Sequence, residues 1–143
     1  MNWKKETVEL KKRRSLAKKQ GGDKAIDLQH AKGRLTLRER IDLLLDKDSF
    51  QEQGEIAGGS ETNEKGEIES LTPANFILGF GKISGKQVVV GGEDFTVKGG
   101  SPNSAGLRKS VYTEELALKY KVCLLYTSPS PRDATLSRMP SSS

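Results

Sequence analysis

Residues 80–101 read FGKISGKQVVVGGEDFTVKGGS, and this stretch carries the clearest pattern of secondary structure in the chain. A first apolar run ends at Ile83 and meets the turn pair Ser84-Gly85. Three valines at 88–90 then form a second run with no polar face. Such runs are typical of two neighbouring strands, the second of them buried on both sides.

A change of pattern follows these two strands. Phe95 and Val97 alternate with a polar threonine, which predicts extended chain up to residue 97, and Lys-Gly-Gly-Ser at 98–101 then ends the extended run. Helical spacing follows over 103–121, carried by Leu107, Val111, Leu118 and Val122. The predicted class is therefore α/β, with a ββα unit at its centre.

Gly99, Gly100 and Ser101 lie where the extended run gives way to the helix. Glycines let a ligand approach the backbone closely, and free N–H groups at a helix start favour negative charge. The sequence therefore indicates a backbone site for an anion, such as a phosphate or an oxyanion. The alternative is that this Gly-Gly pair is only a turn.

Charge is distributed unevenly along the 143 residues, whose formal net charge is +5. Residues 1–22 hold eight basic and two acidic residues, whereas residues 23–122 hold 14 basic and 16 acidic ones. A basic helix over 3–20 is predicted, with Trp3, Leu10 and Ala17 on one stripe. No aromatic residues interleave with its charges, which favours a solvated amphipathic helix over a nucleic-acid arm.

Two further helices are predicted before the strands. Asp23 is expected to cap a helix that runs to residue 32, with Gly33 as its left-handed stop. Thr36 and Glu39 have the spacing of a capping box. The buried stripe of that helix is expected to be Leu37, Ile41, Leu44 and Leu45. Beyond it, Phe50 and Ile56 are expected to face inward, and residues 58–69 to form an exposed loop.

Side-chain catalytic groups are scarce. His30 is the single histidine, and a capping or packing role is preferred to a catalytic one. The adjacent pairs Glu93-Asp94 and Glu114-Glu115 point in different directions on a strand or helix, so their spacing does not make a paired-carboxylate site. The sequence predicts no catalytic side chain, no metal site and, with Cys123 as its only cysteine, no disulfide.

Two long blocks carry a family resemblance, GGEDFTVKGGS at 91–101 and QHAKGRLTLRERIDLLLDKDSF at 29–50, with Glu52 also in place. They resemble the carboxyltransferase β subunits of biotin-dependent acyl-CoA carboxylases, of the propionyl-CoA and methylcrotonyl-CoA carboxylase type. The resemblance runs from about Leu16 to Val122. It implies the first ββα turn of a crotonase-like spiral in a truncated, partial N-terminal domain at 23–122, preceded by the basic helix at 1–22.

The resemblance also implies an activity, the transfer of a carboxyl group from carboxybiotin to the α-carbon of an acyl-CoA. Backbone N–H groups hold the oxyanions in that family, and Gly99, Gly100 and Ser101 match its acyl-CoA loop. Biotin would be carried on a partner. The expected partners are a biotin carboxyl carrier protein, a biotin carboxylase and further copies of the chain, as a hexamer. A cytoplasmic setting, no nucleic acid and no membrane are expected.

Three questions stay open at this point. The residues after Ser101 depart from the propionyl type, so the acyl chain of the substrate is not assigned. The segment by itself is expected to be inactive. One rival function is an acyl-CoA decarboxylase subunit of the same superfamily. The other is a non-enzymatic module that binds partners through its basic helix, with the Gly-Gly pair as a simple turn.

The end of the chain breaks the pattern. Residues 123–133 read CLLYTSPSPRD, which resembles a translated sequencing-library adapter, and the following residues resemble the adjoining primer. Residues 123–143 are therefore expected to be an artefactual, disordered tail outside the fold. The alternative is a genuine Ser/Pro-rich tail.

Overall fold

The computed structural model describes residues 2–127. Three helices come first, α1 (Lys4–Ala17), α2 (Asp23–Ala31) and α3 (Leu37–Leu44), followed by β1 (Gln51–Gln53). A hairpin of β2 (Gly58–Thr62) and β3 (Ile68–Pro73) precedes β4 (Phe76–Ile83) and β5 (Lys86–Glu93). The short 3₁₀ turn η1 (Lys98–Gly100), α4 (Ser104–Tyr120) and β6 (Cys123–Tyr126) complete the order. The predicted α/β class and its ββα unit are confirmed.

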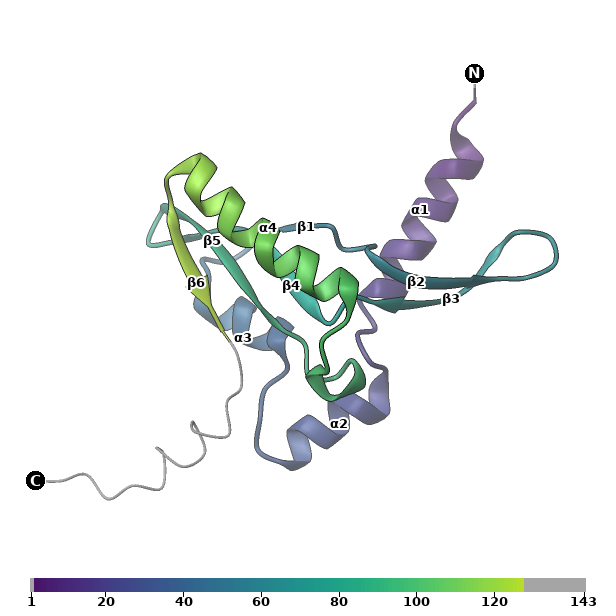
Figure 1. Ribbon diagram of the computed structural model, residues 1–143, viewed down its shortest axis with the longest axis horizontal. Coiled ribbons are helices and arrows are strands. Elements are labelled where there is room, and N and C mark those ends of the chain that lie inside the picture. The colour runs from purple at the N-terminus through teal and green to yellow at the C-terminus, as the bar shows by residue number, and fades with distance from the viewer. Residues whose placement is uncertain (1, 128–143) are drawn as a thin grey trace, which may run out of the picture.

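The centre of the fold is a four-stranded sheet in the order β1-β4-β5-β6. β4 and β5 pair antiparallel, and Ser84 and Gly85 between them both have positive φ, at 50° and 78°. Positive φ at both central residues is the condition for the tight hairpin turn that matches strand twist. α4 covers one face of this sheet and α3 lies against the other, as Figure 1 shows.

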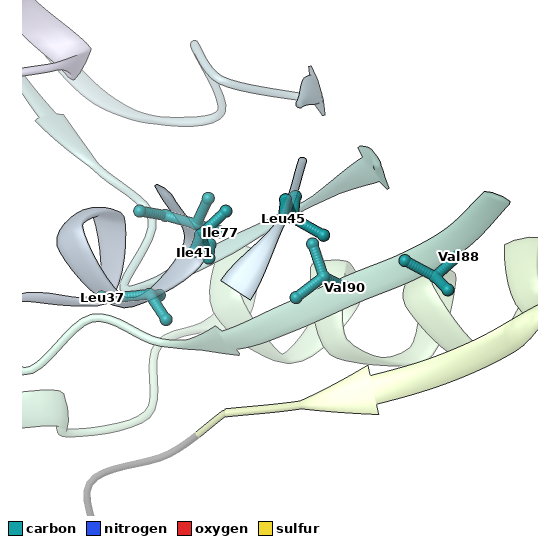
Figure 2. Packing of buried hydrophobic residues seen from close by; sticks show 6 residues of the cluster. All are labelled: Leu37, Ile41, Leu45, Ile77, Val88 and Val90. Atoms are coloured by element: carbon teal, nitrogen blue, oxygen red, sulfur yellow. The ribbon is translucent and has the colours of Figure 1, made fainter. Parts of the chain in front are cut away.

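This layered arrangement explains why the valine run has no polar face. Val88 and Val90 pack with residues of α3 on one side, while Val89 packs with Leu116 and Ala117 of α4 on the other. Figure 2 shows the first of these clusters, formed by Leu37, Ile41, Leu45, Ile77, Val88 and Val90. A strand covered on both faces must be apolar at every position, so the predicted strand buried on both sides is confirmed.

The predicted helix is confirmed as α4, but its large periodic apolar residues do not face the sheet. Leu107, Val111 and Leu118 are exposed, at 59%, 57% and 80%. The buried face carries mainly smaller residues, with one lysine: Gly106, Lys109, Thr113, Leu116 and Ala117. Small side chains let a helix approach a sheet closely. The spacing of large apolar residues along the sequence therefore does not reveal which face of this helix packs on the sheet.

The first three helices confirm some local predictions and correct others. Thr36 and Glu39 form the complete capping box, and Gly33 has the left-handed φ of 69° that the predicted stop requires. The N-cap of α2 is Gly22, so Asp23 begins that helix and does not cap it through its side chain. Leu44 is 41% exposed, because the chain becomes extended at Leu45 and only Leu45 turns toward the sheet.

The N-terminal helix buries little of its predicted stripe. Ala17 is buried, but Trp3 and Leu10 are exposed because α1 contacts the rest of the chain mainly through β3. Figure 1 shows α1 and the β2–β3 hairpin on the same side of the molecule. Residues 58–69 contain β2 and the start of β3, so the predicted loop is a hairpin, although β2 is exposed as expected. Ile56 is also exposed.

Two segments around β5 differ from prediction. Residues 95–97 form a turn and not a strand, because the chain bends at Asp94, whose carboxylate accepts the amide hydrogen of Thr96. Cys123–Tyr126 forms β6, which pairs parallel with β5 from Val88↔Cys123 to Gly91↔Tyr126. The expected exclusion of these residues from the fold is wrong for β6, since its leucines pack against both sheet clusters. The rest of the predicted tail, residues 128–143, lies outside the described residues.

None of the helices within residues 2–127 is long and apolar enough to cross a membrane.

Candidate functional site

The candidate site is the 99–101 loop, made of Gly99, Gly100 and Ser101, which connects the turn after β5 to α4. Lys98, Gly99 and Gly100 have consecutive positive φ values of 47°, 63° and 80°. Glycine adopts this left-handed region without steric cost. A Cβ on Gly99 would meet open space, whereas one on Gly100 would contact the Phe95 ring at 3.0 Å. Gly99 therefore forms the open side of the loop.

The three amide groups of the loop are used differently. Gly100 N–H donates to the Val97 carbonyl at 3.0 Å, and Ser101 N–H donates to the Lys98 carbonyl at 3.1 Å. Within residues 2–127 the Gly99 amide has no acceptor. The sequence pointed to all three as anion donors, but in this conformation two of them close the loop's own turn. Among residues 2–127, the Gly99 amide is therefore the one of the three without an acceptor.

The start of α4 adds donors next to the loop. Asn103 is the N-cap, and its side-chain oxygen accepts from Gly106 N–H at 2.6 Å. The preceding amides of Ser104 and Ala105 belong to the helix's first turn, where the backbone has no intrahelical acceptor. These residues and Lys98 line a groove of about 490 Å³ whose opposite wall is the β2–β3 hairpin around Gly58. Lys98 and the first residues of α4 thus line the same groove.

A buried hydrogen-bond network supports the turn before the loop. Asp94 is 1% exposed and accepts from Thr96 N–H at 3.0 Å and from the Thr96 hydroxyl at 2.6 Å. Gly21 N–H donates to the same hydroxyl oxygen at 3.0 Å. A Cβ on Gly21 would overlap the Thr96 carbonyl oxygen, so only glycine allows this approach. Burial raises the pKa of Asp94, and the hydrogen bonds from Thr96 oppose that rise.

A second set of polar side chains comes from α3, β1 and the buried face of α4. Arg38 donates to both carboxylate oxygens of Glu52, at 2.8 and 3.0 Å, in a bidentate pair. Lys109 is 8% exposed and donates to the Gly54 carbonyl at 3.1 Å. Burial lowers the pKa of Lys109 to about 8, although the nearby carboxylate of Glu52 favours its charged form. Lys109 thus joins α4 to the residues after β1, and the Arg38–Glu52 pair joins α3 to β1.

The remaining polar residues named from the sequence do not converge on the loop. His30 Nε2 lies 2.9 and 3.0 Å from the carboxylate oxygens of Glu39, so it contacts the capping box of α3. That contact and the Thr36 N–H hold the pKa of Glu39 below its usual value. Glu93 is exposed while Asp94 is buried, and Glu114 and Glu115 are both exposed on α4. Over residues 2–127, no cluster of three acidic, histidine or cysteine residues could hold a metal ion.

Two residues that sequence reasoning missed lie directly at the loop. Lys98 lines the groove, opposite a hairpin that contributes Glu61, and Asn75 donates from its side-chain amide to the Ser101 carbonyl at 2.8 Å. The lysine could have been noted as the charged neighbour of the glycines. Asn75 is 26 residues from Ser101 in sequence, so no local pattern relates the two.

Comparison with known proteins places the segment in a family. Residues 28–130 match the family model described as the carboxyl transferase domain. The propionyl-CoA carboxylase beta chain of Roseobacter denitrificans is 37% identical over 111 residues, which cover 78% of this chain and 22% of that protein. The methylmalonyl-CoA decarboxylase subunit alpha of Veillonella parvula is 36% identical over 99 residues, or 69% of this chain and 19% of that protein.

Solved structures agree with this placement. The crystal structure of transcarboxylase 12S, a hexamer assembly with methylmalonyl-coenzyme A bound, matches with a TM-score of 0.74 and 29% identity. The match covers 96% of this chain and 28% of that one. The crotonase-like fold expected from the two sequence blocks is thereby confirmed for this segment. The chain spans about a fifth of the length of the curated relatives it matches. Because the family model covers most of its residues, the chain belongs to the carboxyl transferase domain family.

Proposed function

We propose that this chain is a segment of a biotin-dependent carboxyltransferase subunit, and that its 99–101 loop binds the thioester end of an acyl-CoA. The match of residues 28–130 to the carboxyl transferase domain carries the proposal. The open side of the loop at Gly99 and the adjoining groove support the location. The acyl chain is not assigned.

The chemistry requires stabilisation of negative charge rather than a reactive side chain. Carboxyl transfer to an acyl-CoA would break the N–C bond of carboxybiotin and form a C–C bond at the α-carbon, and the proton lost from that carbon would pass to the biotin nitrogen that the carboxyl group leaves. The thioester oxygen gains negative charge as the enolate forms. A preorganised amide donor in a dry site is worth about 3 kcal/mol at such an oxygen. The Gly99 amide would supply one such donor, and the Lys98 ammonium would add positive charge nearby.

Partners and cofactor follow from the proposed function. Biotin would arrive on a biotin carboxyl carrier protein after carboxylation by a biotin carboxylase, and the full-length subunit would assemble as a hexamer in the cytoplasm. We assign none of residues 2–127 to biotin, and propose neither a metal nor a nucleic acid as a ligand. In this proposal the residues of the 99–101 loop contact the acyl-CoA and not biotin.

The decarboxylase direction is the second candidate. It is favoured by the 36% identity to the alpha subunit of a methylmalonyl-CoA decarboxylase. The same transfer run in reverse would move a carboxyl group from an acyl-CoA to biotin. The loop would stabilise the same enolate in both directions, so the loop geometry is compatible with either.

A transfer assay tests the proposal and separates the two directions. The full-length polypeptide that contains this segment is combined with biotin carboxylase, carrier protein, ATP, labelled bicarbonate and a series of acyl-CoA esters. Acid-stable label in the CoA ester, dependent on the carrier, is expected of a carboxylase. Release of CO₂ from a malonyl-type CoA, with no ATP-dependent fixation, would identify the decarboxylase. If neither reaction is detected with any of the esters, the proposed function is overturned.

A further inference from the structure

Asn75 occupies a central place behind the 99–101 loop. It lies between β3 and β4 and is 3% exposed. Its backbone carbonyl accepts from Asp94 N–H at 2.8 Å, and its side-chain Nδ2 donates to the Ser101 carbonyl at 2.8 Å. One residue thus contacts both the turn that precedes the loop and the end of the loop itself.

The side-chain oxygen of Asn75 extends these contacts to α4. A Cβ on Gly106 would overlap this Oδ1 atom, and would also lie 3.1 Å from the Oδ1 of Asn103. Gly106 therefore leaves the space in which the carboxamide of Asn75 lies. The amide hydrogen of Gly106 is at the same time the donor to the N-cap. The carboxamide is thus packed between Ser101 and the first turn of α4.

This arrangement fixes both ends of the segment from Ser101 to Gly106. We propose that Asn75 is the positioning residue of the 99–101 loop, setting the direction of the Gly99 amide relative to the start of α4. The proposal rests on the proposed function, because the loop's orientation matters to catalysis only if acyl-CoA binds there. Asn75 acts through Ser101 and does not touch the substrate.

The chemistry of the site explains why asparagine fits. The Ser101 carbonyl accepts a part-buried hydrogen bond from Asn75, and such a bond is worth about 0.5 to 1.5 kcal/mol. A carboxylate has no donor and would place negative charge against that carbonyl oxygen. A protonated carboxyl group, however, has an O–H that can donate. In the variant N75D, acyl-CoA binding should therefore be weakened when the new carboxyl group is ionised and should recover when that group is protonated.

The test uses the full-length enzyme and its KM for acyl-CoA. At pH 8, N75D should raise this KM about tenfold, the effect of losing about 1.4 kcal/mol, and leave the KM for the carboxylated carrier within twofold. As pH falls to about 5.5, the raised KM should return toward that of the wild type, because burial raises a carboxyl pKa into this range. Wild-type enzyme should lack this recovery. A merely destabilised subunit would lose activity toward both substrates.

A second variant and a matched control separate positioning from folding. G106A displaces the carboxamide from its other side and should raise the same KM without the recovery at low pH. N63D makes the same chemical change on the exposed hairpin loop, where Asn63 donates to Glu67, and should leave both KM values unchanged. Normal KM for acyl-CoA in both N75D and G106A, or equal defects toward both substrates, would overturn the positioning role.

Amide hydrogen exchange decides the structural part independently of activity. In N75D, exchange over residues 99–106 should accelerate at least about tenfold at pH 8, while exchange in α3 stays unchanged. Unchanged exchange at the loop would overturn the inference even if the enzyme is active. A wild-type enzyme that transfers no carboxyl group would instead overturn the proposed function, and the exchange result would still decide whether Asn75 orders the loop.

Discussion

Replacement of Lys109 by methionine should change how the stability of the fold depends on pH. The lysine is on the buried face of α4, is 8% exposed, and donates to the Gly54 carbonyl. Burial lowers its pKa from 10.5 to about 8. In the unfolded chain the pKa returns to about 10.4. Between these two values the unfolded chain binds more protons than the folded one.

The sign and size of the effect follow from that difference. Stability rises with pH wherever the unfolded state binds more protons, so the cost of the buried charge is fully present below about pH 8 and relieved toward about pH 10.5. A shift of this size corresponds to about 3 kcal/mol. Lys109→Met removes this cost but also a hydrogen bond worth about 1 kcal/mol. We therefore expect the variant to be about 2 kcal/mol more stable at pH 7.

Urea unfolding of the 143-residue chain at several pH values between 7 and 10.5 measures this effect. The free energy of unfolding of the wild type relative to K109M should rise by about 3 kcal/mol across the range, because groups common to both chains cancel. The exposed Lys82 gives a matched control, K82M, for which the difference should stay flat. A pH-independent difference between wild type and K109M would refute the account of Lys109 as a buried cation.

Three further predictions concern the loop and the ion pairs. Gly99→Ala should cost about 1 kcal/mol in unfolding free energy, the strain of a left-handed alanine, whereas Gly100→Ala should cost more because its Cβ also meets the Phe95 ring; equal costs in urea unfolding would contradict this geometry. Glu52→Gln should cost about 2 to 3 kcal/mol at pH 7, since it leaves the mostly buried Arg38 guanidinium without its carboxylate, and an unchanged urea midpoint would contradict that cost. Glu39→Gln should destabilise at pH 7, and its difference from the wild type should shrink as pH falls below the ordinary value of 4.5, since a lowered carboxyl pKa adds stability that is lost as pH falls through it; a difference in thermal midpoint that does not change with pH would contradict this.

Local chemistry made much of the fold predictable. The capping box of Thr36 and Glu39 depends on residues three apart, and the turn at Ser84 and Gly85 depends on two residues, so both could be read from the sequence. The valine run at 88–90 was predictable because a strand covered on both faces leaves no position for a polar side chain. These features need no knowledge of distant contacts.

Features that depend on distant contacts could not be predicted. The stripe of Leu107, Val111 and Leu118 has ideal helical spacing, yet the helix turns its smaller residues toward the sheet. Asn75 lies in a segment without a periodic pattern, and its role appears only when Ser101 and Gly106 are placed around it. The glycines mark the position of the loop in the sequence, but which of its amides are free depends on the turn that they close.

The strand near the end of the chain, β6, also differs from the prediction. Residues 123–126 were excluded because of what they resemble, while their apolar character alone allows a strand beside β5. Leu124 and Leu125 supply one apolar side chain to each face of the sheet. The origin of residues 123–143 stays a prediction that resequencing of the gene across the Val122 codon would test.

The most direct test of the central claim is an experimental structure of the full-length polypeptide with an acyl-CoA bound. The account predicts that the thioester oxygen lies within about 3 Å of the Gly99 amide nitrogen. It also predicts that Gly100 and Ser101 keep the turn hydrogen bonds to Val97 and Lys98. An acyl-CoA bound elsewhere, with the Gly99 amide in contact only with protein or water, would show that the glycine pair is a turn and would contradict the account.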